Sequence, residues 1–252
     1  MKSPLPTLVV FALLCGLASP ALSGQSATGL LQQFRTANAR LGLPKDVTLT
    51  GTVRDHTGKT QSVEILIKGK DKMRFTAGAG KEQRITIYNR NEGWIVVDKK
   101  IQALQEHSSV RRPTIIPALD LLVEMDSPKL IANDQGFKSI GPQSVRHVML
   151  SLPDPASKRS FGRKLDENLD VYFDPATMLV VRTQRLRRAE ENMDYQVPSI
   201  MEFSDYRMVE NVAVPFRIVN TIGNSQSTLT LISVVFNRNL QNSVFTPAGG
   251  VQ

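Results

Sequence analysis

Short runs of alternating apolar and polar residues, separated by turn residues, limit the fold of this 252-residue chain more than any other feature. The first run places Val47, Leu49 and Val53 on one side and ends at the turn 56–59. A period of two buries one face of a strand, and turns at this spacing favour consecutive antiparallel strands. We predict strands at residues 47–53, 63–67, 73–76, 84–88, 94–97, 145–152, 170–174, 179–186, 200–207, 216–221 and 228–237.

Two segments interrupt this pattern with helical spacing. Apolar side chains three and four positions apart occupy residues 30–41, before Pro44, and the same spacing returns at residues 114–125. In the second segment, Thr114 is the expected N-cap, and Pro117 lies in the first turn, where a missing N–H costs little.

Two helices cover one face of so long a sheet only if the sheet curls. The expected fold class is therefore mainly β (α+β). It is an unclosed antiparallel β-barrel, a strongly curved meander, with an N-terminal helix and a helical lid inserted midway. The periodicity leaves open whether the interior is filled or holds a cavity.

The first 23 residues have the pattern of a secretory signal peptide. Lys2 precedes an apolar run at residues 8–17, and small residues at 19, 21 and 23 suit a cleavage site. The run is too short for the roughly 20 residues of a membrane-spanning helix, which argues against an uncleaved anchor. No small residue directly precedes Cys15, the only cysteine, which argues against a lipid anchor there. We expect a signal peptide at residues 1–23 and a single domain at residues 24–252.

No grouping of residues in the sequence indicates catalysis or metal binding. His56, His107 and His147 lack partners at metal-binding spacing, and the carboxylates within residues 166–174 occur in a turn-like setting. No nucleophile elbow, phosphate-binding loop or dinucleotide-binding motif occurs. Aromatic residues make up only 6%, so the net charge of +8 does not by itself indicate nucleic-acid binding. We expect no enzymatic activity, no cofactor, no metal and no nucleic-acid partner, and the alternative of an exported hydrolase is not favoured.

Several motifs occur in an order that resembles a known family. They are Lys72-Met73-Arg74-Phe75, Asn91-Glu92-Gly93-Trp94, Phe203-Ser204-Asp205-Tyr206-Arg207, Val214-Pro215-Phe216 and the tail from Val244 to Val251. Together with the first helix and the helical insert, they extend over most of the chain after the signal segment. In this order the chain resembles, as a divergent relative, the periplasmic outer-membrane lipoprotein carriers LolA and LolB and the wider lipoprotein-sorting-like group.

The resemblance implies an apolar cavity beneath the helical lid that receives acyl chains. Carried onto this sequence, the cavity wall and lid consist of Ile65, Ile67, Phe75, Ile87, Trp94, Ile115, Ile116, Leu119 and Leu122. Burial of acyl methylenes, at about 0.8 kcal/mol each, would drive binding. The resemblance also implies a periplasmic location, transient membrane contact, and as partners a lipid or lipoprotein, an inner-membrane transporter complex and an outer-membrane acceptor.

The sequence departs from the family in the turn after the second long strand. The carriers have an Arg-Pro pair there whose arginine holds the lid, whereas this chain has Gly69-Lys70. Lys68 and Lys70 are the candidates to replace it, although lysine lacks the planar fork of arginine. With Arg111 and Arg112 they are expected as charges at the cavity rim, unless these charges protect an exposed strand edge. The leading hypothesis is a non-enzymatic carrier of a lipid or acylated lipoprotein to the outer membrane. The alternative is a protein-interaction or envelope-sensing module with the same fold.

Overall fold

The computed structural model describes residues 26–38, 43–90, 92–104, 112–125, 130–152, 167–188 and 196–247. The predicted signal segment lies outside these residues. The elements are α1 (Ala27–Asn38), β1 (Asp46–Arg54), β2 (Thr60–Lys68), β3 (Lys72–Ala77), η1 (Gly80–Glu82), β4 (Arg84–Asn89), β5 (Glu92–Val97), β6 (Lys100–Ala103), α2 (Pro117–Met125), β7 (Ile131–Ile140), β8 (Gln143–Leu152), β9 (Glu167–Phe173), β10 (Val180–Arg188), β11 (Gln196–Val209), β12 (Val212–Ile222), β13 (Ser225–Phe236) and η2 (Asn242–Phe245).

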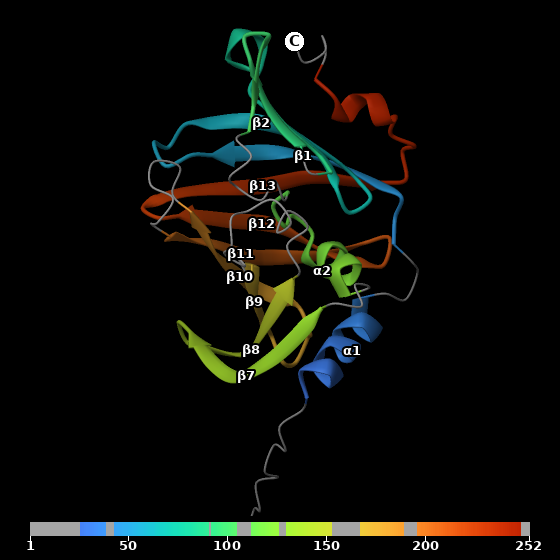
Figure 1. Cartoon of the computed structure of the whole chain (residues 1–252), viewed down its shortest axis with the longest axis vertical. Helices are drawn as coiled ribbons and strands as arrows, with labels where there is room; N and C mark the ends of the chain where they lie inside the picture. The colour runs from blue at the N-terminus through green and yellow to red at the C-terminus, as the bar shows by residue number, and fades with distance from the viewer. Residues whose placement is uncertain are drawn as a thin grey trace, which may run out of the picture.

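One antiparallel sheet contains all thirteen of these strands, in the order β6-β5-β4-β3-β2-β1-β13-β12-β11-β10-β9-β8-β7. Strands that follow one another along the chain are neighbours, except β6 and β7, and the first and last strands, β1 and β13, pair in the middle of the sheet. Strands β6 and β7 stand at opposite edges, so the barrel is not closed. The chain between them must cross from edge to edge, and Figure 1 shows the helix that it carries, α2, lying against the open side of the curved sheet. The predicted fold class is confirmed.

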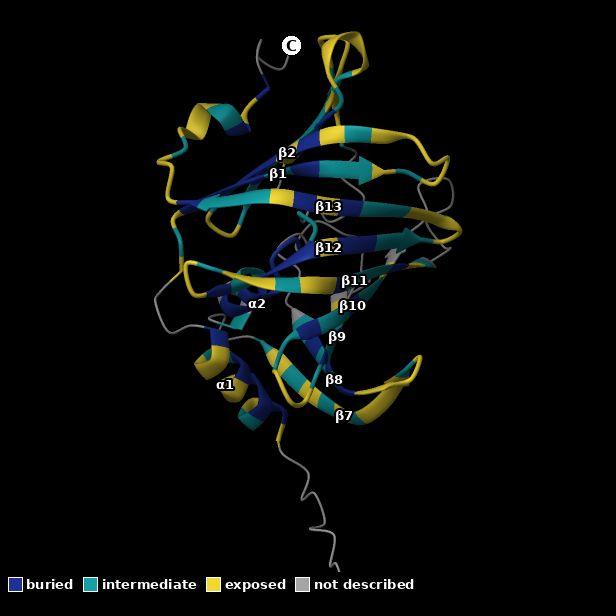
Figure 2. Ribbon diagram, turned by 180° about the vertical axis from the view of Figure 1, so that it is seen from behind, coloured by how far each residue is buried: buried dark blue, intermediate teal, exposed yellow. Residues whose placement is uncertain are grey.

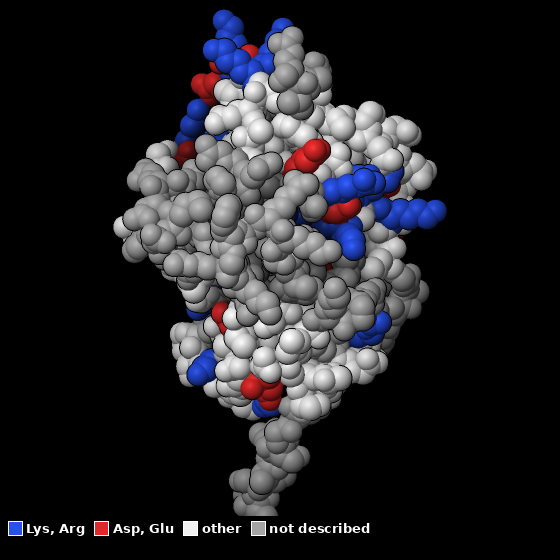
Figure 3. Space-filling view, viewed as in Figure 1, with Lys and Arg blue, Asp and Glu red and all other residues white. Residues whose placement is uncertain are grey.

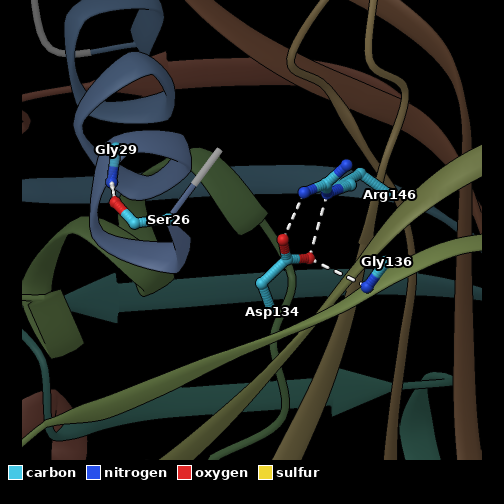
Figure 4. Close-up of polar contacts among 5 residues, drawn as sticks. All are labelled: Ser26, Gly29, Asp134, Gly136 and Arg146. Atoms are coloured by element: carbon cyan, nitrogen blue, oxygen red, sulfur yellow. Dashed lines mark hydrogen bonds and ion pairs between the residues drawn. The ribbon is translucent and has the colours of Figure 1, made fainter. Parts of the chain in front are cut away.

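Local chemistry explains where the two helices begin. Helix α1 follows Ser26, whose Oγ accepts the N–H of Gly29 at 3.1 Å, the usual N-cap contact (Figure 4). Helix α2 begins at Pro117, three residues after the predicted start, and the side chain of Asp120 accepts the N–H groups of Ile115 and Ile116, which precede the helix. Proline is well suited to this first helical position.

The concave face of the sheet and the two helices share one core. Register pairs Leu49 with both Ile65 and Val234, which places these side chains on the concave face. Helix α1 adds Phe34, whose ring centroid lies 5.3 Å from that of Phe173 in an edge-on contact. The buried residues of α2 belong to the same cluster. In Figure 2 the buried colour is concentrated in the first half of β1, the second half of β2 and the first part of β12, and on the inner sides of both helices, whereas edge strand β7 is mostly exposed or intermediate.

The convex face of β2, β3 and β4 is covered by the C-terminal segment around η2. This segment contacts β3 and β4, and its Phe245 is fully buried. Three basic side chains hold it by hydrogen bonds: Lys68 Nζ to the Leu240 carbonyl at 2.6 Å, Lys72 Nζ to Asn242 Oδ1 at 3.1 Å, and Arg74 Nη1 to the Val244 carbonyl at 3.4 Å. The sheet therefore has a second apolar layer outside the barrel.

Candidate functional site

A single arginine connects the segment before α2 to both the helix and the sheet. The Nη2 atom of Arg112 lies 2.5 Å from Asp120 Oδ1, and its Nε donates to the carbonyl oxygen of Lys70 at 3.0 Å. Lys70 belongs to the turn between β2 and β3, beside which Lys and Arg side chains gather together with acidic ones in Figure 3. We call Arg112, Asp120 and the Lys70 carbonyl the latch, because they fix the N-terminal end of α2 to this turn.

The latch borders a small cavity between α2 and the beginning of the central strands. Its volume is about 100 Å³, and its lining consists of Leu43, Pro44, Asp46, Val47, Ile67, Gly69, Arg112, Ile116, Leu119 and Asp120. An engineered cavity of about 150 Å³ holds benzene, and pockets for small molecules usually measure about 300 Å³ or more. In this closed arrangement the cavity is therefore too small for an acyl chain, and such a ligand can enter only if α2 moves.

The polar groups around this cavity are almost fully paired. Asp120 uses Oδ1 for Arg112 and Oδ2 for the N–H groups of Ile115 and Ile116, at 2.9 and 3.2 Å. Asp46, which is 2% exposed, accepts the N–H groups of Arg238 and Leu240 at 2.7 and 3.1 Å. The exception is Nη1 of Arg112, which is buried and has no hydrogen-bond partner among the described residues.

Most of the predicted lid and wall residues lie on the concave side. Ile65 and Ile67 of β2 are buried, and Phe75 packs against the same core while remaining half-buried. Ile115, Ile116 and Leu122 are buried where α2 meets the core, and Leu119 is half-buried. Three of these residues, Ile67, Ile116 and Leu119, line the cavity itself.

Two predicted wall residues, Ile87 and Trp94, lie on the other face of the sheet. Ile87 pairs with both Arg74 and Trp94, and Arg74 hydrogen-bonds to the C-terminal segment on the convex side. Side chains directly opposite one another on antiparallel strands share a face. The prediction that Ile87 and Trp94 line the same wall as Ile65 is therefore corrected. Their burial belongs to the outer layer that contains Phe245.

The residues predicted to supply charges at the cavity rim also lie in different parts of the structure. Lys68 binds the C-terminal segment on the convex face, so it does not replace the family arginine at the lid. Lys70 contributes its backbone carbonyl to the latch, whereas its residue is otherwise exposed. Arg111 lies outside the described residues. Of the predicted rim residues that the structure describes, only Arg112 lines the cavity, and its partner Asp120 was not among the predicted site residues.

A larger and more open hollow lies elsewhere, between the end of α1 and the β11–β12 hairpin. Its volume is about 360 Å³, and its lining includes Asn38, Tyr206, Arg207, Met208 and Asn211. Tyr206 donates its hydroxyl to the Val180 carbonyl at 2.6 Å, and burial raises the pKa of that hydroxyl. Because the hollow lies away from α2 and its polar groups serve the surrounding fold, the cavity beside the latch is the better candidate site.

The described residues form an unclosed antiparallel barrel with a helix laid across its mouth, a fold that several solved structures share. Among solved structures, the chain is similar to a domain from Vibrio parahaemolyticus that is provisionally assigned to outer-membrane lipoprotein sorting, with a TM-score of 0.56 at 12% identity over 87% of this chain and 95% of the other. A LolA superfamily protein from Nitrosomonas europaea gives 0.54 at 11% identity over 88% and 98%, and a DUF1329 family protein from Desulfovibrio piger gives 0.55 at 10% over 87% and 95%.

These likenesses confirm the predicted resemblance at the level of the fold. No family profile matches the sequence, and no curated protein matches it. Neither helix in the described ranges is long and apolar enough to cross a bilayer.

Proposed function

We propose that this chain is an exported, non-enzymatic carrier that holds a lipid, or the acyl chains of a lipoprotein, beneath α2. The observation that carries the proposal is the contact of α2 with the concave wall. Its apolar residues close a small cavity there, and the latch fixes one end of the helix. The fold shared with lipoprotein-sorting-like proteins and the predicted signal segment support a periplasmic location. Delivery from an inner-membrane transporter to an outer-membrane acceptor is part of the same proposal.

The free energy needed to separate α2 from the core is comparable to the free energy gained when an acyl chain is buried beneath it. Separating α2 from the core exposes Ile116, Leu121 and Leu122, each buried to 97% or more, at about 1.5–3 kcal/mol per side chain. An acyl chain that buries about ten methylenes regains about 8 kcal/mol at about 0.8 kcal/mol each. A bound chain can therefore replace the apolar contacts that the lid gives up, and release allows the lid to close again on its own core.

The proposal is tested by binding of a fluorescent neutral acyl ester and by native mass spectrometry of protein recovered from the bacterial envelope. We expect saturable binding and a retained lipid mass. The variant Leu119→Gln, which places an amide at the cavity, should weaken binding about tenfold, whereas Ile232→Gln, at a side chain that is 70% exposed on β13, should not.

Absence of any acyl binding by either method would overturn the carrier proposal. Recovery of a specific protein by crosslinking, with flat lipid titrations, would instead support the alternative of an interaction or envelope-sensing module. Equal loss of binding in both glutamine variants would show that the cavity beside α2 is not the site.

A further inference from the structure

We infer that Arg112 is the polar anchor of the ligand and that it takes a neutral carbonyl oxygen, from an acyl ester or an acyl amide, in preference to a free carboxylate. This inference rests on the proposed function and specifies the chemical class of the ligand. It follows from the unused donor of one buried side chain and from the charges that surround it.

One hydrogen-bond donor of Arg112 is buried and has no acceptor among the described residues. Its Nε is used by the Lys70 carbonyl and its Nη2 by Asp120, whereas Nη1 has no partner among the described residues. The side chain is 9% exposed, so solvent reaches little of it. A buried donor without an acceptor is costly, and Arg112 is one of the residues that line the cavity. An oxygen atom brought by a ligand would satisfy this donor.

The charged side chains that line the cavity determine whether a neutral carbonyl oxygen or a carboxylate oxygen of the ligand is favoured. The guanidinium of Arg112 is already neutralised by Asp120, and a second carboxylate, that of Asp46, also belongs to the lining. Among the described lining residues there is no other lysine or arginine. A ligand carboxylate would therefore add a further negative charge to a largely buried site, which is strongly unfavourable. A neutral carbonyl accepts the same hydrogen bond without adding charge.

Four probes with the same palmitoyl-length chain separate these possibilities in the wild-type protein: the methyl ester, the N-methyl amide, the methyl ether and the free acid. We expect the ester or the amide to bind about ten- to a hundredfold more tightly than the ether. A hydrogen bond to a charged donor contributes a free energy that corresponds to this ratio of dissociation constants. The tighter of the two carbonyl probes identifies the linkage that the site prefers. The free acid, measured at pH 7.5, should bind more weakly than either. With a carbonyl labelled by carbon-13, the bound resonance should shift in the direction of hydrogen bonding.

Two variants test the roles of the charges. Arg112→Gln replaces the charged donor by a neutral amide, so it should reduce the preference for carbonyl over ether while retaining binding of the ether. Asp120→Asn keeps an oxygen for the N–H groups of Ile115 and Ile116 but leaves the guanidinium unbalanced, so the free acid should gain about tenfold relative to the ester. The matched control is Arg90→Gln, at a side chain that is 78% exposed near the same turn, and it should change neither ratio.

The outcomes distinguish this inference from the proposed function. If all four probes fail to bind, the carrier proposal fails and the inference with it. If the probes bind but the ester, amide and ether are equal, or if the free acid is the tightest ligand of the wild-type protein, the carrier proposal stands and the role of Arg112 is overturned. The carbon-13 shift is read on the wild-type protein, so its absence overturns the role of Arg112 even if a variant fails to fold.

Discussion

Two largely buried arginines, Arg112 and Arg146, each hold neighbouring segments together by pairing with an aspartate. Arg112 holds the start of α2, whereas Arg146 of β8 forms a two-pronged pair with Asp134 of β7 (Figure 4). Asp134 also accepts the N–H of Gly136 at 2.9 Å, and the guanidinium of Arg146 lies 4.9 Å from the ring centre of Phe137. Burial alone would raise the pKa of Asp134, but the hydrogen bonds from Arg146 and Gly136 and the positive charge of Arg146 outweigh it, so the pKa is lowered.

We predict that Asp134→Asn destabilises the protein by about 2–3 kcal/mol at pH 7, because it removes the carboxylate that pairs with the largely buried charge of Arg146. Since the pKa of Asp134 is lowered on folding, its contribution is complete above about pH 4, near the carboxyl's ordinary value, and declines as the pH falls through its folded-state pKa. Urea unfolding from pH 7 to pH 3 measures both effects. The wild-type and variant curves should converge only below about pH 4, and a difference independent of pH would contradict the ionic origin.

For single residues, the sequence predicts which side chains of a strand are buried better than it predicts which face of the sheet they lie on. Ile87 and Trp94 are apolar and buried, as expected, but alternation by itself does not say which face of a strand turns inward. That choice follows from the register with β3, where Ile87 stands opposite Arg74. Arg112 was expected at the cavity rim, but its contacts with Lys70 and Asp120 were not predicted, because only the fold brings these residues together.

Among the elements, the central strands were predictable and the edge strands were not. Strands β6 and β7 are absent from the prediction, and they are the two edges of the sheet. An edge strand needs fewer apolar residues because less of it is covered, and Ile131 and Phe137 of β7 are 60% and 44% exposed. The polar pattern of β7 therefore lacks the alternation from which the other strands were predicted. The C-terminal segment around η2 was also recognisable only as a motif, without its place on the outer face.

The outer layer provides a prediction at the level of elements. Trp94 is the only tryptophan and is 7% exposed on the face that η2 covers next to β4. We expect Phe245→Ala, which removes a fully buried ring, to destabilise the protein by about 3–5 kcal/mol and to shift the Trp94 emission to longer wavelength. Phe137→Ala, at the far edge of the sheet, is the control and should leave the emission unchanged. Acyl binding beneath α2 should also leave it nearly unchanged, and a large shift on binding would place Trp94 at the ligand.

The whole molecule consists of two runs of strands joined at one place. Strands β1 to β6 form one run and β7 to β13 the other, and the β1–β13 pairing is the strand contact that unites them. The register of this pair shifts between Thr50 and Gly51, and Ile232 of β13 is left without a partner there. Gly51 permits the close approach: a Cβ atom at this position would lie 2.2 Å from the carbonyl oxygen of Thr230, well inside any tolerable contact.

We therefore predict that Gly51→Ala weakens the junction itself, at a cost of about 1–3 kcal/mol or more, because backbone atoms rather than a flexible side chain must give way. The matched control is Gly141→Ala in the β7–β8 turn, where the added methyl meets nothing within 4 Å and only the left-handed backbone, with φ of 57°, opposes it. This control should cost about 1 kcal/mol.

Urea unfolding should be followed both by Trp94 fluorescence, which reports on the first run, and by circular dichroism, which reports on the whole sheet. If the two runs form one domain, as we propose, both signals shift together in Gly51→Ala. Separate transitions in the wild-type protein would divide the chain at the β1–β13 pair, and an unchanged midpoint in Gly51→Ala would contradict the close approach of these two strands.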